Sequence, residues 1–233
     1  ADARKGKIYG KLIKEITIAA RTGGGNPDGN PRLKTAILAA RAENMPNDNV
    51  ERAIKRGTGE IEGAAFEEMS LEGYGPGGVA LLIDCATDNR NRTISDVRST
   101  LTKNGGNMGE AGCVAWAFEK KGYLSVPKSA IAEDALIEAA LDAGADDVQT
   151  QSDSYDILTP IDAFDKVKTA LEGKGIKFDE AKLARIPQNT VRLEGADAKK
   201  MLDLMGYLED LDDVQNVWSN FDIDEKLMAE LTQ

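Results

Sequence analysis

The chain of 233 residues contains no histidine, and this absence removes several kinds of chemistry. Histidine is the commonest protein metal ligand and the commonest general base at neutral pH. Without it, Ser–His and Cys–His nucleophile pairs cannot form within the chain. A zinc site would need a cluster of cysteines, and only two cysteines are present. We therefore expect a protein that is not an enzyme and has no metal ion or other cofactor.

The two cysteines, Cys85 and Cys113, lie in the apolar runs ALLIDCA and GCVAWAF. A single distant pair does not make a disulfide framework, so we expect buried, reduced thiols. No apolar run approaches the roughly 18–20 residues that span a membrane, and no signal-peptide pattern opens the chain. These features favour a cytoplasmic protein with no membrane partner.

Charge is divided unevenly along the chain, although its net value is −11. Residues 1–57 contain 12 Lys and Arg against 6 Asp and Glu, whereas the remaining residues contain 17 basic and 34 acidic ones. A local basic face attracts phosphate backbones whatever the distant net charge. The split therefore indicates a nucleic-acid-binding segment followed by an acidic body.

The basic segment has the pattern of three helices. Over residues 4–21, Ile8, Leu12, Ile16 and Ala19 form an apolar stripe, and three lysines recur on the opposite side as a basic outer stripe. The run GGGNPDGN ends this helix. Asn30 should cap a second helix that begins with Pro31 and runs to about residue 43. A third helix, from Pro46, should end at Gly57.

The pattern changes after a linker at 58–64, and strands and helices alternate from there. FEEMSLEGYG and GVALLIDCATD predict strands, RTISDVRSTLTKNGG predicts a helix, and GCVAWAFEKKGYLSVP predicts two strands around a turn at Lys120–Gly122. Residues 122–187 have the order β-α-β-β-α-β of a ferredoxin-like, split βαβ unit. The C-terminal segments TVRLEG and DVQNVWSNF could complete the sheet that begins near 66.

We therefore predict an α+β protein of three domains. A basic helical domain spans 1–60, a middle α/β domain spans 61–121 and 188–233, and the third α/β domain, 122–187, is inserted in the second.

Two motifs suggest sites, and each also has a plain structural explanation. EGYGPGG (72–78) contains Gly-x-Gly, but the loop leads into a strand and not into a helix, which favours a turn between strands over a cofactor site. TDNRNRT (87–93) offers Arg90 and Arg92 at a helix start, where a ligand site and simple capping by Asn91 or Thr93 remain alternatives. KNGGNMG (103–109) favours a C-cap loop.

Carboxylates gather near the C-terminus at Glu209, Asp210, Asp212 and Asp213. Acid–base or metal chemistry needs convergent geometry, and no pattern in the sequence indicates it. These residues follow a predicted helix among few apolar neighbours, which favours a solvated acidic edge.

Four separate blocks of sequence resemble the YebC/PmpR family. They are residues 23–59, EGYGPGGVA (72–80), TDNRNRT (87–93) and GGNMGEAGCVAW (105–116). The family includes regulators of transcription and the mitochondrial translational activator of cytochrome oxidase subunit one. The resemblance implies a helical domain followed by two α/β domains, nucleic-acid binding and no enzymatic activity. Family members usually begin with a further basic segment containing GHSKW-like and KHRK-like stretches. Neither stretch occurs here, and their absence should weaken nucleic-acid affinity.

The leading hypothesis is a transcriptional regulator that binds DNA. The alternatives are a ribosome-associated translation factor that binds RNA and a scaffold that contacts only proteins, including the transcription machinery. Phosphate attraction alone carries no base sequence information, so it does not separate DNA from RNA. The candidate nucleic-acid-binding residues are the basic residues of the helical segment and the two arginines of the 87–93 motif. They are Arg4, Lys5, Lys7, Lys11, Lys14, Arg21, Arg32, Lys34, Arg41, Arg52, Lys55, Arg56, Arg90 and Arg92.

Overall fold

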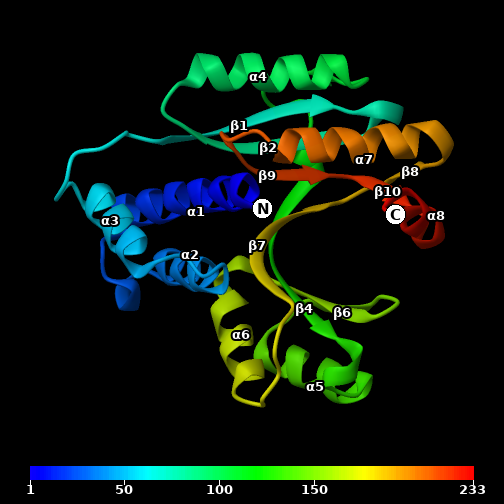
Figure 1. Cartoon of the computed structure of the whole chain (residues 1–233). Coiled ribbons are helices and arrows are strands. Elements are labelled where there is room, and N and C mark those ends of the chain that lie inside the picture. Colours follow the sequence, from blue (N-terminus) through cyan, green and yellow to red (C-terminus); the bar gives the residue numbers. More distant parts are fainter. The chain divides into compact units, whose positions relative to one another are not determined.

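The computed structural model describes every residue from Ala1 to Gln233 and divides into two compact units. One unit contains Ala1–Ala115 together with Thr190–Gln233, and the other contains Trp116–Asn189. Figure 1 shows the helical start of the chain and the sheets that follow it. The fold is α+β, as the sequence predicts. None of its helices is both long enough and apolar enough to cross a membrane.

Three helices begin the first unit: α1 (Asp2–Gly23), α2 (Pro31–Ala42) and α3 (Asn47–Thr58). The Asn30 side chain joins the first two helices. Its oxygen accepts a hydrogen bond from the Leu33 N–H, which confirms the predicted cap, with Pro31 at the first helical position. Its amide group donates to the carbonyls of Ala19 and Gly24, so the end of α1 is tied to the start of α2.

The three helices share one small core of buried apolar residues. They are Ile16, Ala19, Ala20, Leu33, Ala36, Ile37, Ala40, Met45, Val50 and Ala53. Helix α3 does not end at Gly57, as the sequence predicts, but at Thr58, and it is followed by the C-cap Gly59, whose φ of 83° is favourable for glycine. Gly57 instead lies against α1. A Cβ there would be 2.4 Å from the Thr17 carbonyl oxygen and 2.7 Å from the Ala20 Cβ.

The first unit also contains a four-stranded antiparallel sheet, whose strands lie in the order β3-β1-β2-β9. Its strands are β1 (Glu67–Tyr74), β2 (Ala80–Thr87), β3 (Asn107–Met108) and β9 (Val214–Ser219). Helices α4 (Arg90–Lys103) and α7 (Gly195–Glu209) share a core with Leu81 and Ile83 of β2. Since β9 pairs with β2, the C-terminal part of the chain completes this sheet. The predicted strand near 191 does not join it. There β8 (Val191–Leu193) pairs in parallel with β10 (Phe221–Ile223), which precedes α8 (Glu225–Leu231).

The second unit is a separate four-stranded antiparallel sheet, ordered β5-β6-β4-β7, with two helices. Its elements are β4 (Phe118–Pro127), α5 (Glu133–Ala143), β5 (Asp147–Thr150), β6 (Ser154–Thr159), α6 (Phe164–Glu172) and β7 (Glu180–Pro187). The chain order β-α-β-β-α-β confirms the split βαβ unit. Its core includes Leu124, Leu136, Ile157, Val167 and Leu171, all fully buried.

The predicted turn at Lys120–Gly122 is wrong, because β4 passes through these residues without interruption. Glycine is needed at position 122 because neighbouring side chains approach its backbone closely, and not because the chain turns there. A Cβ would be 2.1 Å from the Thr159 hydroxyl oxygen and 2.6 Å from the Phe164 ring, so only glycine fits beneath these side chains.

Substitution of Gly57 tests the close packing of α1 and α3. We expect Gly57→Ala to lower the free energy of unfolding by about 1–3 kcal/mol, because the new methyl group overlaps α1 backbone. Gly10→Ala is the matched control, since nothing lies within 4 Å of a Cβ at Gly10. It should raise stability by up to about 1 kcal/mol through helix propensity. Urea unfolding followed by circular dichroism measures both, and equal effects would contradict the packing.

Candidate nucleic-acid interface

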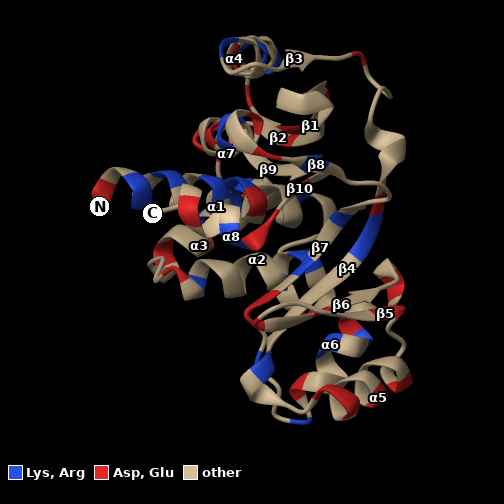
Figure 2. Ribbon diagram, turned by 90° about the vertical axis from the view of Figure 1, so that its right-hand side faces the viewer, with Lys and Arg blue, Asp and Glu red and all other residues tan.

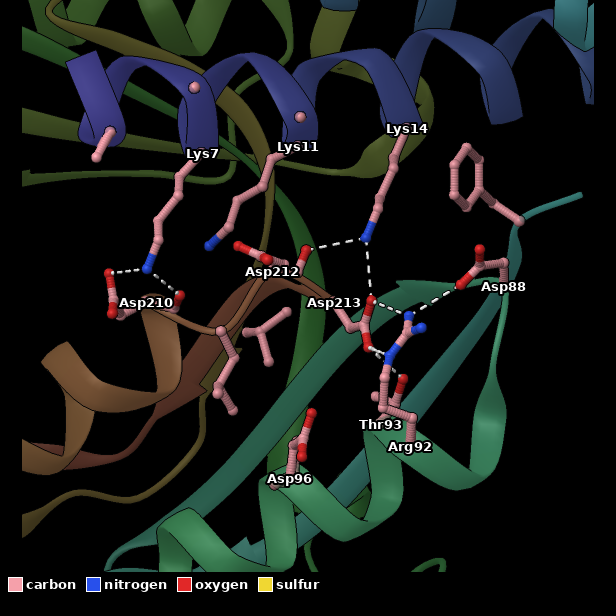
Figure 3. A pocket seen from close by; sticks show the side chains of 17 residues that line it. Lys7, Lys11, Lys14, Asp88, Arg92, Thr93, Asp96, Asp210, Asp212 and Asp213 are labelled. Carbon is pink, nitrogen blue, oxygen red and sulfur yellow. Dashed lines mark hydrogen bonds and ion pairs between the residues drawn. The ribbon is translucent and has the colours of Figure 1, made fainter. Parts of the chain in front are cut away.

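Lys7, Lys11 and Lys14, here called the lysine row, line one side of α1 because their spacing of three and four residues matches the helical turn. Figure 3 shows the row pointing towards Asp210, Asp212 and Asp213, which belong to residues 209–213, here called the acidic segment, at and just after the end of α7. The Lys7 ammonium lies 2.8 Å from the Asp210 carboxylate and also donates to the Asp210 carbonyl. Lys11 donates to the carbonyl of Glu209. Burial lowers the pKa of Lys11, against the charges of the nearby acids.

Lys14 lies deeper and uses all three of its ammonium donors. It donates to the carbonyls of Ala86 and Asp212 at 3.1 and 3.0 Å, and to the Asp213 carboxylate at 3.1 Å. Its side chain is only 13% exposed, and its ammonium lies 5.5 Å from the centre of the Phe66 ring. Lys14 therefore holds α1 against the end of β2 and the acidic segment.

Asp213 is the centre of this network, and its side chain is only 7% exposed. Besides Lys14, it accepts two hydrogen bonds from the Arg92 guanidinium, at 2.9 and 3.1 Å, and one from the Thr93 hydroxyl at 2.8 Å. Burial alone would raise the pKa of the Asp213 carboxyl. The hydrogen bonds from Arg92, Thr93 and Lys14 outweigh burial and leave that pKa below its ordinary value.

A hollow of about 920 Å³ lies beside these contacts, between α1 and the acidic segment. Small residues of α1 form part of its wall, with Gly6 and Gly10 leaving open space above the helix backbone. Asp88 and Asp96 line the opposite side (Figure 3).

The prediction of a solvated acidic edge is wrong for Asp213, whereas Glu209, Asp210 and Asp212 are exposed as predicted. Asp213 is nearly buried, and Asp210 pairs with Lys7, so the segment is the partner of the lysine row. The lysine row is likewise not an outward stripe open to solvent, because each of its members is half-buried and hydrogen-bonded within the chain.

The arginines of the 87–93 motif take different positions. Arg92 bonds Asp213 and, at 2.9 Å, Asp88, while Arg90 is exposed and lies 4.0 Å from Glu67. Helix α4 is capped by the side chain of Asn89, so the expected caps, Asn91 or Thr93, are wrong.

Arg32 of α2 is also committed within the chain. Its guanidinium lies 2.7 Å from Glu15 and 2.5 Å from Glu68. The hydrogen bonds that Arg32 donates to Glu15 and to Glu68 raise the pKa of Arg32, although burial opposes them.

The eight other basic residues of the helical domain, here called the open basic residues, are exposed and form no ion pair within 4.0 Å of an acidic group. They are Arg4, Lys5, Arg21, Lys34, Arg41, Arg52, Lys55 and Arg56. Of these, Lys5 lies 5.4 Å from the centre of the Tyr9 ring. Figure 2 shows Lys and Arg along α1 and on its neighbouring helices.

Sequence reasoning missed Glu72, a nearly buried carboxylate on β1. It accepts backbone hydrogen bonds from Gly112, Val114 and Ala115 at 2.5, 3.0 and 2.6 Å. Burial raises the pKa of Glu72, but these three bonds outweigh it and lower the pKa overall. Glu72 thus fixes the loop that leads out of the first unit. Only its position as the first residue of the motif EGYGPGG (72–78) could have indicated it.

The remaining motifs have structural roles. The glycines of 72–78 form a turn at Pro76–Gly78 between β1 and β2, which confirms the predicted turn. Cys85 is buried, and burial raises the pKa of its thiol to about 12, so the thiol stays protonated. Cys113 is only partly buried, so the expectation of two buried thiols is wrong for it.

The sequence matches two family descriptions in chain order. Residues 1–60 match the "TACO1/YebC protein N-terminal domain", and residues 66–221 match the "TACO1/YebC second and third domain". The chain belongs to the TACO1/YebC family. The resemblance stated from the sequence is thereby confirmed, and so is the plan of a helical domain with two α/β domains.

Relatives with assigned names are described as regulators. A "probable transcriptional regulatory protein" of Geobacter sp. (strain M21) is 60% identical over 231 residues, covering 99% of this chain and 93% of the relative. One of Geobacter sulfurreducens is 58% identical with the same coverage. A crystal structure of a conserved hypothetical protein from Aquifex aeolicus has a TM-score of 0.87 and 48% identity, covering 96% of this chain and 93% of that one.

Removal of the Asp213 charge tests the network. We expect Asp213→Asn to lower the free energy of unfolding by about 3 kcal/mol, because Lys14 and Arg92 lose their shared, nearly buried partner. The control is Asp96, which lines the same hollow but has no side-chain hydrogen bond. Asp96→Asn should change the free energy of unfolding by less than about 0.5 kcal/mol. Chemical unfolding measures the stability of both variants. Equal losses of unfolding free energy in the two would show that Asp213 does not hold the network together.

Stability should also depend on pH through the two carboxylates. The pKa values of Asp213 and Glu72 are lowered in the folded protein, so their stabilisation is complete above the unfolded pKa values, about 4, and is lost as pH falls through the folded ones. We expect the free energy of unfolding to decline below about pH 4 and to decline less steeply in Glu72→Gln. Denaturant titrations at several pH values measure this. An unchanged decline in Glu72→Gln would argue against the Glu72 contribution.

Proposed function

We propose that this protein is a transcriptional regulatory factor that binds DNA through the open basic residues of its helical domain. The observation that supports this most directly is their freedom from internal ion pairs. Of the 12 basic residues in 1–57, the lysine row and Arg32 have partners inside the chain, and the other eight have exposed side chains. Exposed, unpaired ammonium and guanidinium groups can neutralise phosphates and release counterions.

Helix α3 concentrates this charge. Arg52, Lys55 and Arg56 lie on its last turns with the three- and four-residue spacing that groups side chains on one side. Helix α2 adds Lys34 and Arg41, both exposed. The acidic residues elsewhere in the chain disfavour other orientations of a polyanion and so favour approach by this domain.

The regulatory part of the proposal rests on the relatives, whose names describe probable transcriptional regulation. DNA is accordingly the partner proposed here, and the cytoplasm the compartment. RNA, in a ribosome-associated translation factor, is the alternative result of the binding test. Aromatic stacking on single strands has little support, because the hydroxyl of Tyr9 is held by the carbonyls of Glu43 and Asn44.

Charge removal on α3 tests the interface. We expect the triple variant Arg52→Ala, Lys55→Ala, Arg56→Ala to weaken duplex DNA binding by about 10- to 100-fold. It should also reduce the slope of log K against log salt by about 2 to 3, because three phosphate contacts are lost. Fluorescence anisotropy across a salt series measures both, with RNA of equal length titrated in parallel.

The matched control removes three exposed basic residues of the middle domain that have no ion pair: Arg98→Ala, Lys103→Ala, Lys200→Ala. Net charge changes equally in both variants, so a difference between their DNA affinities would report a local interface on α3. Equal weakening by the two variants, or no salt-dependent binding by the unmodified chain, would overturn the proposal. Tighter binding of RNA than of DNA would favour the translation alternative.

A further inference from the structure

The lysine row is bonded by backbone carbonyl oxygens and by two carboxylates, those of Asp210 and Asp213, which are anionic like the oxygens of a phosphate backbone. Lys7, Lys11 and Lys14 face a succession of carboxylate and carbonyl oxygens from one short segment, residues 209–213. Ammonium groups bind carboxylate and phosphate oxygens by the same charge-assisted hydrogen bonds. The acidic segment therefore occupies a position in which it competes with a polyanion for the same donors.

We propose that the acidic segment is a built-in competitor of nucleic acid, which covers the outer part of the lysine row until phosphates displace it. This inference rests on the proposed function, since it needs nucleic acid to approach the helical domain. It adds Lys7 and Lys11 to the interface as phosphate contacts that become available only after the segment moves.

The two ends of the row differ in how firmly they are held. At the outer end, the side chains of Lys7 and Asp210 are 41% and 69% exposed. Water and salt screen such a pair, so a polyanion can replace the carboxylate at little cost. At the inner end, Lys14 is 13% exposed, and Asp213 has four hydrogen bonds from three side chains. Displacement therefore stops before Lys14, and α1 stays attached to the middle domain.

Donor counting leads to the same division. An ammonium group can donate three hydrogen bonds, and Lys14 donates all three, to Ala86, Asp212 and Asp213. Lys7 donates two, both to Asp210. The Lys11 ammonium donates a single hydrogen bond, to the Glu209 carbonyl. The outer two lysines thus retain donors for a phosphate, and Lys14 retains none.

The hollow gives a phosphate chain room to reach the outer lysines. Gly6 and Gly10 line it and leave the surface of α1 open beside Lys7 and Lys11. Asp88 and Asp96 line its far side and repel phosphates there. Asp210 and Asp212 also line the hollow, so a polyanion reaches the outer end of the row only by displacing them.

Neutralising the competitor tests the proposal. The double variant Asp210→Asn, Asp212→Asn keeps side-chain shape and removes two charges, and we expect it to bind duplex DNA about 3- to 10-fold more tightly than the unmodified chain. The control Glu110→Gln, Glu230→Gln makes the same charge change at exposed positions outside the acidic segment and the hollow. It should change binding by less than about 2-fold. The gain should disappear when Lys7→Ala and Lys11→Ala are added, because the released donors are then absent.

Zero-length coupling of Lys7 to Asp210 by carbodiimide, read by peptide mass spectrometry, follows the displacement directly. Saturating duplex DNA should reduce the coupled fraction several-fold. The competitor model is overturned if the unmodified chain binds DNA but Asp210→Asn, Asp212→Asn behaves like its control. It is also overturned if the gain survives loss of both lysines, or if coupling is unchanged by DNA. Absence of salt-dependent DNA binding by the unmodified chain and by all variants would instead reject the proposed function.

Discussion

The carboxylate of Asp213 joins segments that lie far apart in the chain. It accepts hydrogen bonds from Lys14 of α1 and from Arg92 and Thr93 of α4, while its own segment connects α7 to β9. A nearly buried charge is tolerated only when such donors surround it, so this set of contacts constrains all of its members together. The placement of α1 beside the sheet depends on it, and so does the choice of basic residues that remain exposed.

Charge in this chain consequently has two uses. Part of the basic charge of the helical domain is used inside the molecule, in the lysine row and at Arg32. The rest is exposed, with α3 as its densest part. The acidic excess is not simply a repellent body, because the acidic segment binds the first helix of the chain. A net charge of −11 hides both uses, since it sums groups that neutralise one another locally with groups that face solvent.

Glycine and asparagine illustrate which local features sequence reasoning could reach. Asn30 before Pro31 predicts a helix start, because the cap is formed within four residues and needs no distant partner. For Gly57 and Gly122 the sequence predicts a helix end and a turn, and the structure contradicts both predictions. Both residues are glycine because a neighbouring segment approaches too closely for a Cβ, and a glycine selected by a distant contact looks the same in a sequence as one selected by φ.

The sequence by itself determined the helical domain with its local charge, the α+β class, the split βαβ order and the family, because each follows from short-range pattern or from matching blocks of residues. Only the tertiary structure decided which basic residues are committed internally. Lys7 and Asp210 are 203 positions apart, and Lys14 and Asp213 are 199 apart. Periodicity identifies the face of a helix on which a side chain lies. Which segment covers that face depends on the pairing of β9 with β2, two strands far apart in the sequence. The pairing of β9 with β2 places the acidic segment, which directly precedes β9, against the lysine row near the beginning of the chain.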